Sequence, residues 1–146
     1  MIIRPMKKKD LNQVLDIEAV SFISPWKETQ FHYELKENPF SFLFVAEEGT
    51  YIIGFVDFWI TFEQATINQI AVLPGLRKKG IGTVLLLDTI ERMKTAGAIS
   101  ASLEVRTNNT AGFELYKKHG FETVTTKKHY YDNGDDAYYM IKDLTK

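Results

Sequence analysis

The sequence predicts an α+β or mixed α/β domain, in which one sheet is covered by helices on both faces. Two helix-like segments come first, three strand-like segments follow one another, and helices and strands then alternate to the end. The expected order is therefore ααβββαβαββ, which by itself does not name a fold family. Because the chain has 146 residues and is 45% hydrophobic, we expect a single domain spanning residues 1–146.

The first predicted helix runs from about residue 11 to residue 20. Asp10 followed by Gln13 resembles a capping box, and apolar residues then recur at helical spacing. A proline-containing stretch interrupts this pattern. Residues 27–36 then predict a short second helix, which ends at the Asn38-Pro39 pair.

The middle and end of the chain predict the sheet and two further helices. Stretches rich in aromatic and β-branched residues predict an antiparallel meander of strands at 41–47, 51–61 and 65–73. The spacing then becomes helical from Ile81 to near Gly97. The remaining predicted elements are a strand at 99–105, a short helix capped by Asn108 or Asn109 and ending near Lys118, and two strands flanking a turn at 132–135 through Asn133-Gly134.

The composition excludes several classes of function. The 18 basic and 19 acidic residues give a net charge of -1, so the signature of a general nucleic-acid binder is missing. The absence of cysteine excludes disulfides, thiolate metal sites and a cysteine nucleophile. The three histidines are scattered, and no metal site is expected. Since no signal peptide or membrane span is predicted, we expect a cytoplasmic monomer or weak dimer.

The stretch "LPGLRKKGIGTVLL", residues 73–86, gives the first indication of chemistry. A strand ends near Val72, two glycines follow, and a helix begins near Ile81, so unpaired backbone N–H groups gather at a positive dipole end. Glycine also lets a ligand approach the backbone closely. An anion site is predicted, with phosphate as its commonest occupant. A solvated basic turn is the alternative from these residues alone.

Two phosphate-binding motifs are excluded at this junction. Gly75 and Gly80 have the glycine spacing of a nucleotide P-loop, but Ile81 stands where lysine is required. A dinucleotide fingerprint needs a third glycine where Leu85 stands. The pattern that remains is RxxGxG, from Arg77 to Gly82.

This pattern resembles the coenzyme A pyrophosphate loop of the Gcn5-related N-acetyltransferase superfamily, written [QR]xxGx[GA]. The preceding "INQIAVLP" and the later "LEVRTNNTAGFELYKKHGF" are similar to the family's segments and occur in the same order. The resemblance implies a twisted, mostly antiparallel central sheet and acetyl-CoA as cosubstrate. The implied cofactor contacts are the main chain of Ile70, Ala71 and Val72, the loop residues Arg77, Lys78, Lys79, Gly80, Ile81, Gly82 and Thr83, and the Asn109 side chain.

Two residues fit the acid and base roles in acetyl transfer to an amine. Strand alternation places Glu104 on the face opposite Leu103 and Val105, where it could face a cleft or solvent. Tyr116, on the helix after the Asn pair, could act as an acid or pack in the core. Because no cysteine can form an acyl-enzyme, we expect direct transfer within a ternary complex.

The similarity is denser to the ribosomal-protein alanine N-acetyltransferases of the RimI type. It rests on "SPW", "INQIAV", "LEVR", "FELYKKHGF" and "HYYDNGDDAYYM". It implies that Glu104 accepts a proton, that Tyr116 donates one to the coenzyme A sulfur, and that Trp26 and Tyr131 contact the acceptor. The implied acceptor is the N-terminal alanine of a small-subunit ribosomal protein. A small-amine or lysine acetyltransferase and a non-catalytic acetyl-CoA-binding module remain as alternatives.

Overall fold

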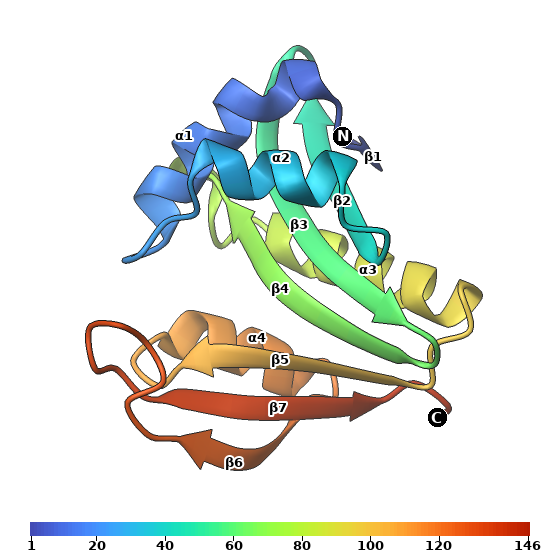
Figure 1. The fold of residues 1–146 in the computed structure, drawn as a ribbon, viewed down its shortest axis with the longest axis vertical. Coiled ribbons are helices and arrows are strands. Elements are labelled where there is room, and N and C mark those ends of the chain that lie inside the picture. Colours follow the sequence, from blue (N-terminus) through green and yellow to red (C-terminus); the bar gives the residue numbers. More distant parts are fainter.

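The computed structural model describes residues 1–146 and shows a seven-stranded sheet between two layers of helices (Figure 1). The strands are β1 (Ile2–Pro5), β2 (Ser41–Glu48), β3 (Tyr51–Thr61), β4 (Gln64–Val72), β5 (Ser100–Arg106), β6 (Glu122–Lys127) and β7 (Ala137–Asp143). Their order across the sheet is β1-β2-β3-β4-β5-β7-β6. Every neighbouring pair is antiparallel except β4 and β5, which are parallel.

Four helices cover the two faces of the sheet. They are α1 (Leu11–Ser21), α2 (Glu28–Lys36), α3 (Ile81–Thr95) and α4 (Thr110–Lys118), with 3-10 turns at Lys8–Asp10 and Pro74–Leu76. Helices α1 and α2 lie on one face, where Phe31 packs against Phe55, and α3 and α4 lie on the other, where Leu85 joins the cluster of Phe58 (Figure 1). None of these helices combines the length and apolarity needed to cross a bilayer.

The predicted order is confirmed from the first helix onward, but an additional strand precedes it. β1 has only four residues and pairs antiparallel with β2, with Ile3 opposite Ala46. A strand this short has too few residues to show an alternating pattern, and it lies at the sheet edge, so its pairing with β2 defines it.

The predicted capping box of Asp10 and Gln13 is wrong. The Asp10 carboxylate accepts the Lys7 backbone N–H at 2.8 Å and two hydrogen bonds from the Arg4 guanidinium, at 2.7 and 2.9 Å. The side-chain oxygen of Gln13 instead accepts the backbone N–H of Ile52 in β3, at 2.9 Å. Both side chains therefore join the start of α1 to the sheet rather than cap the helix.

The other predicted turns are found with small changes. Asn109, not Asn108, caps α4, because its side-chain oxygen accepts the Gly112 N–H at 3.0 Å. The connection between β6 and β7 is longer than a two-residue hairpin and spans residues 128–136. The predicted turn lies inside this loop: Gly134 has a φ of 89°, and its N–H donates to the Tyr131 carbonyl at 2.8 Å.

The parallel pairing of β4 and β5 is short. Gln64–Ile67 pairs with Ser100–Leu103, and beyond these residues the strands diverge (Figure 1). Asn68 has no partner in β3, since Ile67 pairs with Phe58 and Gln69 with Asp57. Such a bulge bends a strand. The later part of β4 therefore has a backbone edge on the side of β5 that does not pair with β5.

Candidate active site

The N-terminus of α3 lies where the chain returns from the end of β4. Gly80, which precedes the helix, has a left-handed φ of 84°, and no side chain caps the helix. The first intrahelical donor is Val84, whose N–H bonds the Gly80 carbonyl at 3.0 Å. The amides of Ile81, Gly82 and Thr83 precede this bond and sit at the positive end of the helix dipole. This arrangement is suited to an anionic group.

The backbone of Gly82 is open to a ligand. A Cβ built on it would have as its nearest neighbours Leu115 Cδ2 at 3.7 Å and Val72 Cγ2 at 3.9 Å, both at ordinary contact distance. An alanine would therefore fit, whereas a large side chain would fill the space in front of the helix terminus.

The basic residues of the loop have different roles. Arg77 is engaged within the protein, because its Nε donates to the Val72 carbonyl at 3.0 Å and its Nη2 to Ser21 Oγ at 3.1 Å. It ties the loop to the end of β4 and to α1. Lys78 and Lys79 are exposed, and Lys78 has a positive φ of 65°. The ammonium groups of Lys78 and Lys79 thus flank the helix terminus without stabilising the fold.

The edge of β4 leads to this terminus. Ile70, Ala71 and Val72 pair with β3 on one side, and on the other side they lie beyond the last residue that pairs with β5. An exposed strand edge can hydrogen-bond an extended ligand that carries amide groups. The strand edge and the α3 amides therefore fit the amide-bearing arm and the diphosphate of coenzyme A.

Glu104 lies on β5, one residue past the last pairing with β4. Its neighbours Leu103 and Val105 are buried in the cluster beneath α3 and α4, so the Glu104 side chain lies on the opposite face. The side chain is only 24% exposed and bonds Lys127 Nζ at 3.0 Å. The carboxylate is therefore partly open to solvent on that face, and its partner cation is Lys127 rather than Arg106.

Tyr116 is nearly fully buried on α4, with its ring edge-on to Phe121. Burial, with a smaller contribution from the nearby Tyr131, raises the pKa of the Tyr116 phenol well above its usual range. The phenol therefore keeps its proton at neutral pH. Tyr116 thus packs in the core, and its protonated phenol has a proton to donate but cannot act as a base.

Tyr131 is held in the β6–β7 loop by Arg106. The guanidinium carbon lies 3.8 Å from the centre of the Tyr131 ring, and the same side chain pairs with Asp135 at 2.8 Å. Burial raises the pKa of Tyr131 to about 12. The loop is therefore anchored to β5 beside Glu104, which places a neutral aromatic residue near both candidate catalytic side chains.

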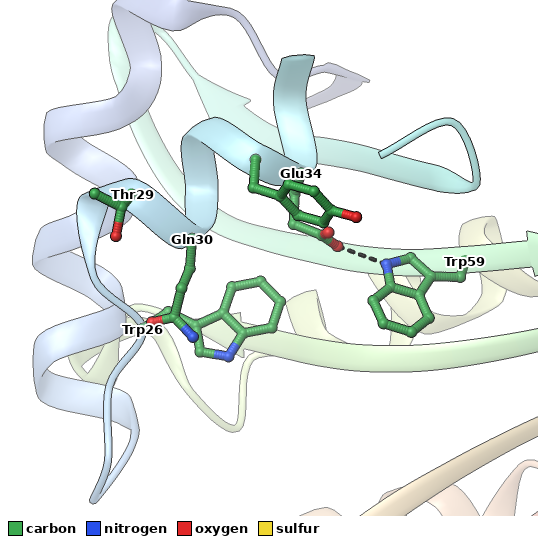
Figure 2. A pocket seen from close by; sticks show the side chains of 6 residues that line it. Trp26, Thr29, Gln30, Glu34 and Trp59 are labelled. Atoms are coloured by element: carbon green, nitrogen blue, oxygen red, sulfur yellow. Dashed lines mark hydrogen bonds between the residues drawn. The ribbon is translucent and has the colours of Figure 1, made fainter. Parts of the chain in front are cut away.

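Trp26 lies in the loop between α1 and α2, just before α2 begins. Its ring packs edge-on against Phe31, with centroids 5.4 Å apart. It also lines a surface pocket of about 350 Å³ between α2 and β3, together with Tyr33, Glu34 and Trp59 (Figure 2). Trp26 thus joins the helices and borders a hollow on the face of the sheet that carries Glu104.

Sequence reasoning missed Glu18, which fixes the loop that carries Trp26. Glu18 is completely buried on α1, and its Oε2 accepts the Trp26 backbone N–H at 2.7 Å and Gln69 Nε2 at 2.9 Å. Burial raises the pKa of this carboxyl. An acidic residue on the apolar face of a predicted helix, one turn after Val14, is the signal that could have revealed it.

A pair of buried acids lies between α2 and the sheet. Trp59 Nε1 donates to Glu34 at 2.5 Å, and Asn68 Nδ2 donates to Asp57 at 2.9 Å. Burial, assisted by the neighbouring Glu34, raises the pKa of Asp57 to about 8. No lysine or arginine pairs with either carboxyl, so nothing offsets the burial of Asp57, and its carboxyl is largely protonated at neutral pH.

Comparisons with known proteins point to the same chemistry. The family described as Acetyltransferase (GNAT) matches residues 11–121. The ribosomal protein bS18-alanine N-acetyltransferase of Escherichia coli (strain K12) is 30% identical over 141 residues, which is 94% of each chain. A Bacillus subtilis (strain 168) protein, whose name provisionally assigns it the same activity, is 39% identical over 139 residues, covering 94% of this chain and 92% of its own.

The fold leads to the same group. The crystal structure of the ribosomal-protein-S18-alanine N-acetyltransferase from Escherichia coli superposes with a TM-score of 0.89 at 27% identity, covering 98% of this chain and 93% of that chain. Acetyltransferases of this fold use acetyl-CoA as the acetyl donor. The matched residues 11–121 include the α3 terminus, the β4 edge, Glu104 and Tyr116. The chain is therefore an N-acetyltransferase that belongs to the acetyltransferase (GNAT) family.

Proposed function

We propose that this enzyme transfers the acetyl group of acetyl-CoA directly to the N-terminal α-amine of a protein, with the N-terminal alanine of a small-subunit ribosomal protein as its acceptor. The observation that carries the proposal is the position of Glu104. Its partly buried carboxylate follows the last β4–β5 pair and lies beside the strand edge that fits the donor. The relatives named for ribosomal protein bS18 support the choice of acceptor.

The donor is held by two parts of the chain. The amides at the start of α3, with Lys78 and Lys79 beside them, bind the diphosphate, and the free edge of β4 orients the amide-bearing arm. When bound, acetyl-CoA supplies an acetyl group activated as a thioester. Asn109, whose side-chain oxygen already caps α4, has its amide NH₂ left to donate.

Glu104 removes a proton from the acceptor. A reference α-amine has a pKa of about 8, so part of it is neutral at pH 7 and the base has a modest task. Holding the amine next to the thioester therefore contributes more to the rate than basicity does. Since the chain has no cysteine to form an acyl-enzyme, the acetyl group passes straight from donor to amine.

Tyr116 supplies the proton that the departing thiolate needs. Its buried phenol stays protonated at neutral pH, as the raised pKa requires. Two anchored loops border the acceptor: the α1–α2 loop with Trp26, held by Glu18, and the β6–β7 loop with Tyr131, held by Arg106. A peptide terminus has main-chain groups that can engage both loops, whereas a small amine does not.

A peptide panel tests this function. The purified enzyme would be given acetyl-CoA and three kinds of acceptor: an alanine-starting peptide from bS18, the same peptide with a blocked terminus and an internal lysine, and small amines such as spermidine. Release of free thiol would be followed. We expect turnover with the free-terminus peptide alone. Turnover confined to lysine or spermidine would contradict the proposed acceptor.

A survey of protein N-termini in cells with and without the enzyme provides the second test. We expect the bS18 terminus to lose its acetyl group when the gene is removed. Tight binding of acetyl-CoA combined with no change at any N-terminus would favour a non-catalytic acetyl-CoA-binding module.

A further inference from the structure

The ammonium group of Lys127, on β6, sits in a cage formed by one carboxylate and two aromatic rings. Its Nζ lies 3.0 Å from Glu104 Oε1, 5.1 Å from the centre of the Tyr130 ring and 4.7 Å from that of Tyr139. A carboxylate attracts an ammonium by charge and hydrogen bonding, and aromatic faces attract it through their quadrupoles. The three groups together form a binding site for a primary ammonium.

The sheet order explains why these groups meet. β7 lies between β5 and β6, so Tyr139 pairs with Glu104 on one side while Ala137 pairs with Lys127 on the other. Tyr130 comes from the loop that follows β6, and its hydroxyl lies 3.5 Å from Glu104 Oε2. Glu104, Lys127 and Tyr139 are therefore held on adjacent strands, and Tyr130 completes the cage from the adjoining loop.

The bond between Lys127 and Glu104 is easy to exchange. The Lys127 side chain is 38% exposed, and ion pairs this open to water contribute little to stability. Its pKa is raised chiefly by the hydrogen bond to Glu104, so it is present as an ammonium. A second ammonium with further contacts to the protein can displace it at little cost.

We propose that Lys127 is an internal competitor of the acceptor, and that its ammonium occupies the position beside Glu104 that the acceptor's α-ammonium takes on binding. This proposal rests on the proposed function, because it takes Glu104 as the proton acceptor. After the exchange, one N–H bond of the bound ammonium breaks and its proton passes to Glu104 Oε1. The nitrogen keeps the electron pair and becomes the neutral amine that attacks.

The exchange also sets a minimum affinity that an acceptor must reach. A tethered group competes at an effective concentration on the order of millimolar. A small amine that binds only through its ammonium must overcome this competition unaided. A peptide terminus adds contacts through its following residues, so it displaces Lys127 more readily. Lys127 thus weakens the binding of every acceptor that uses its ammonium, and a peptide terminus, with its further contacts, still binds when a small amine does not.

Calorimetry on the coenzyme A-bound enzyme tests the competition without any turnover. Two peptides would be compared, the free-terminus acceptor and its des-amino analogue, which lacks the α-nitrogen. For Lys127→Met we expect the free-terminus peptide to bind about tenfold more tightly, because the competitor is gone. The des-amino peptide should bind as it does to the wild type. Acetylation of small amines should rise by a similar factor.

Lys128→Met is the matched control. Lys128 is 74% exposed and pairs with Asp136 at 3.2 Å, not with Glu104. This variant should bind both peptides like the wild type, which would exclude a general effect of removing positive charge from this loop. Lys127→Gln provides a second charge-free variant should Lys127→Met fail to fold.

Two outcomes would overturn the proposal. If the free-terminus peptide binds the charge-free variants no more tightly than the wild type, Lys127 does not compete. If both peptides gain affinity equally, the change is steric and not an exchange of ammonium groups. A failure of the proposed function looks different, because the wild type itself would then acetylate no peptide terminus.

Discussion

Ile67 of β4 and Leu103 of β5 are the last two residues at which these parallel strands pair. The residue after Ile67, Asn68, forms the bulge that bends β4 away, and the residue after Leu103 is Glu104. The divergence of β4 from β5 therefore leaves the strand edge that fits the donor unpaired, and it places the candidate base beside that edge. Both halves of the site depend on the same divergence of two strands.

The helix terminus can be tested at Gly82. We expect Gly82→Trp to lower acetyl-CoA affinity by about two orders of magnitude, because the indole would fill the approach to the α3 amides. Gly82→Ala is the control, since a Cβ there would meet its nearest neighbour at 3.7 Å. Calorimetry measures affinity and circular dichroism checks the fold. Unchanged affinity in a folded Trp variant would place the diphosphate elsewhere.

Replacing the candidate base should affect the rate and leave donor binding intact. Glu104→Gln keeps the shape of the side chain and removes its basicity, so we expect kcat to fall by about 10²- to 10⁴-fold. The affinity for acetyl-CoA should stay unchanged, as the α3 terminus is untouched. Steady-state kinetics with the bS18 peptide measures kcat, and calorimetry measures the affinity for acetyl-CoA. Wild-type turnover would assign the proton transfer to another group or to water.

The phenol of Tyr116 should matter for turnover but not for acceptor binding. For Tyr116→Phe we expect kcat to fall at least about tenfold. A general acid can contribute more than this, but a thiol with a pKa of about 8.5 leaves readily without help. The acceptor KM should be unchanged. Loss of one buried hydroxyl leaves the packing against Phe121 in place, so the fold should be retained. A normal rate at every pH would remove Tyr116 from the mechanism.

The buried acids predict how stability depends on pH. The pKa of Asp57 is about 8 in the folded protein and 3.8 in the reference state, so between these values the folded state holds a proton that the unfolded state has lost. Its contribution to stability is therefore fully present below about pH 4 and is lost as the pH rises to about 8. We expect this loss to be on the order of a few kcal/mol.

Urea unfolding of the wild type and of Asp57→Asn across this range measures the effect. The urea midpoint of Asp57→Asn should decline much less with rising pH than that of the wild type, because asparagine does not titrate. Asp16→Asn is the control, since Asp16 is exposed on α1. Its urea midpoint should decline with rising pH like that of the wild type. Parallel curves for the wild type and Asp57→Asn would show that Asp57 is ionised in the folded protein.

Much of the fold was predicted because its signals are local. The bounds predicted for β3 match those observed, and those for α2, α3 and β5 differ by one or two residues, since alternation, helical spacing and glycine stops all lie within the segment itself. The pattern from Arg77 to Gly82 was placed correctly at a helix N-terminus for the same reason. The error at Asp10 and Gln13 arose because both side chains bond to other elements of the fold.

The sequence by itself determined the element types from the first helix onward, the glycine-rich helix terminus and, through the absence of cysteine, a reaction without a cysteinyl acyl-enzyme. Only the tertiary structure decided which groups surround Glu104, because Lys127 is 23 residues away along the chain and reaches it only through the order β5-β7-β6. It likewise decided that Glu18 and Asp57 are buried. Periodicity shows which face a side chain lies on, but charge partners and burial depend on the strands and helices that pack against that face.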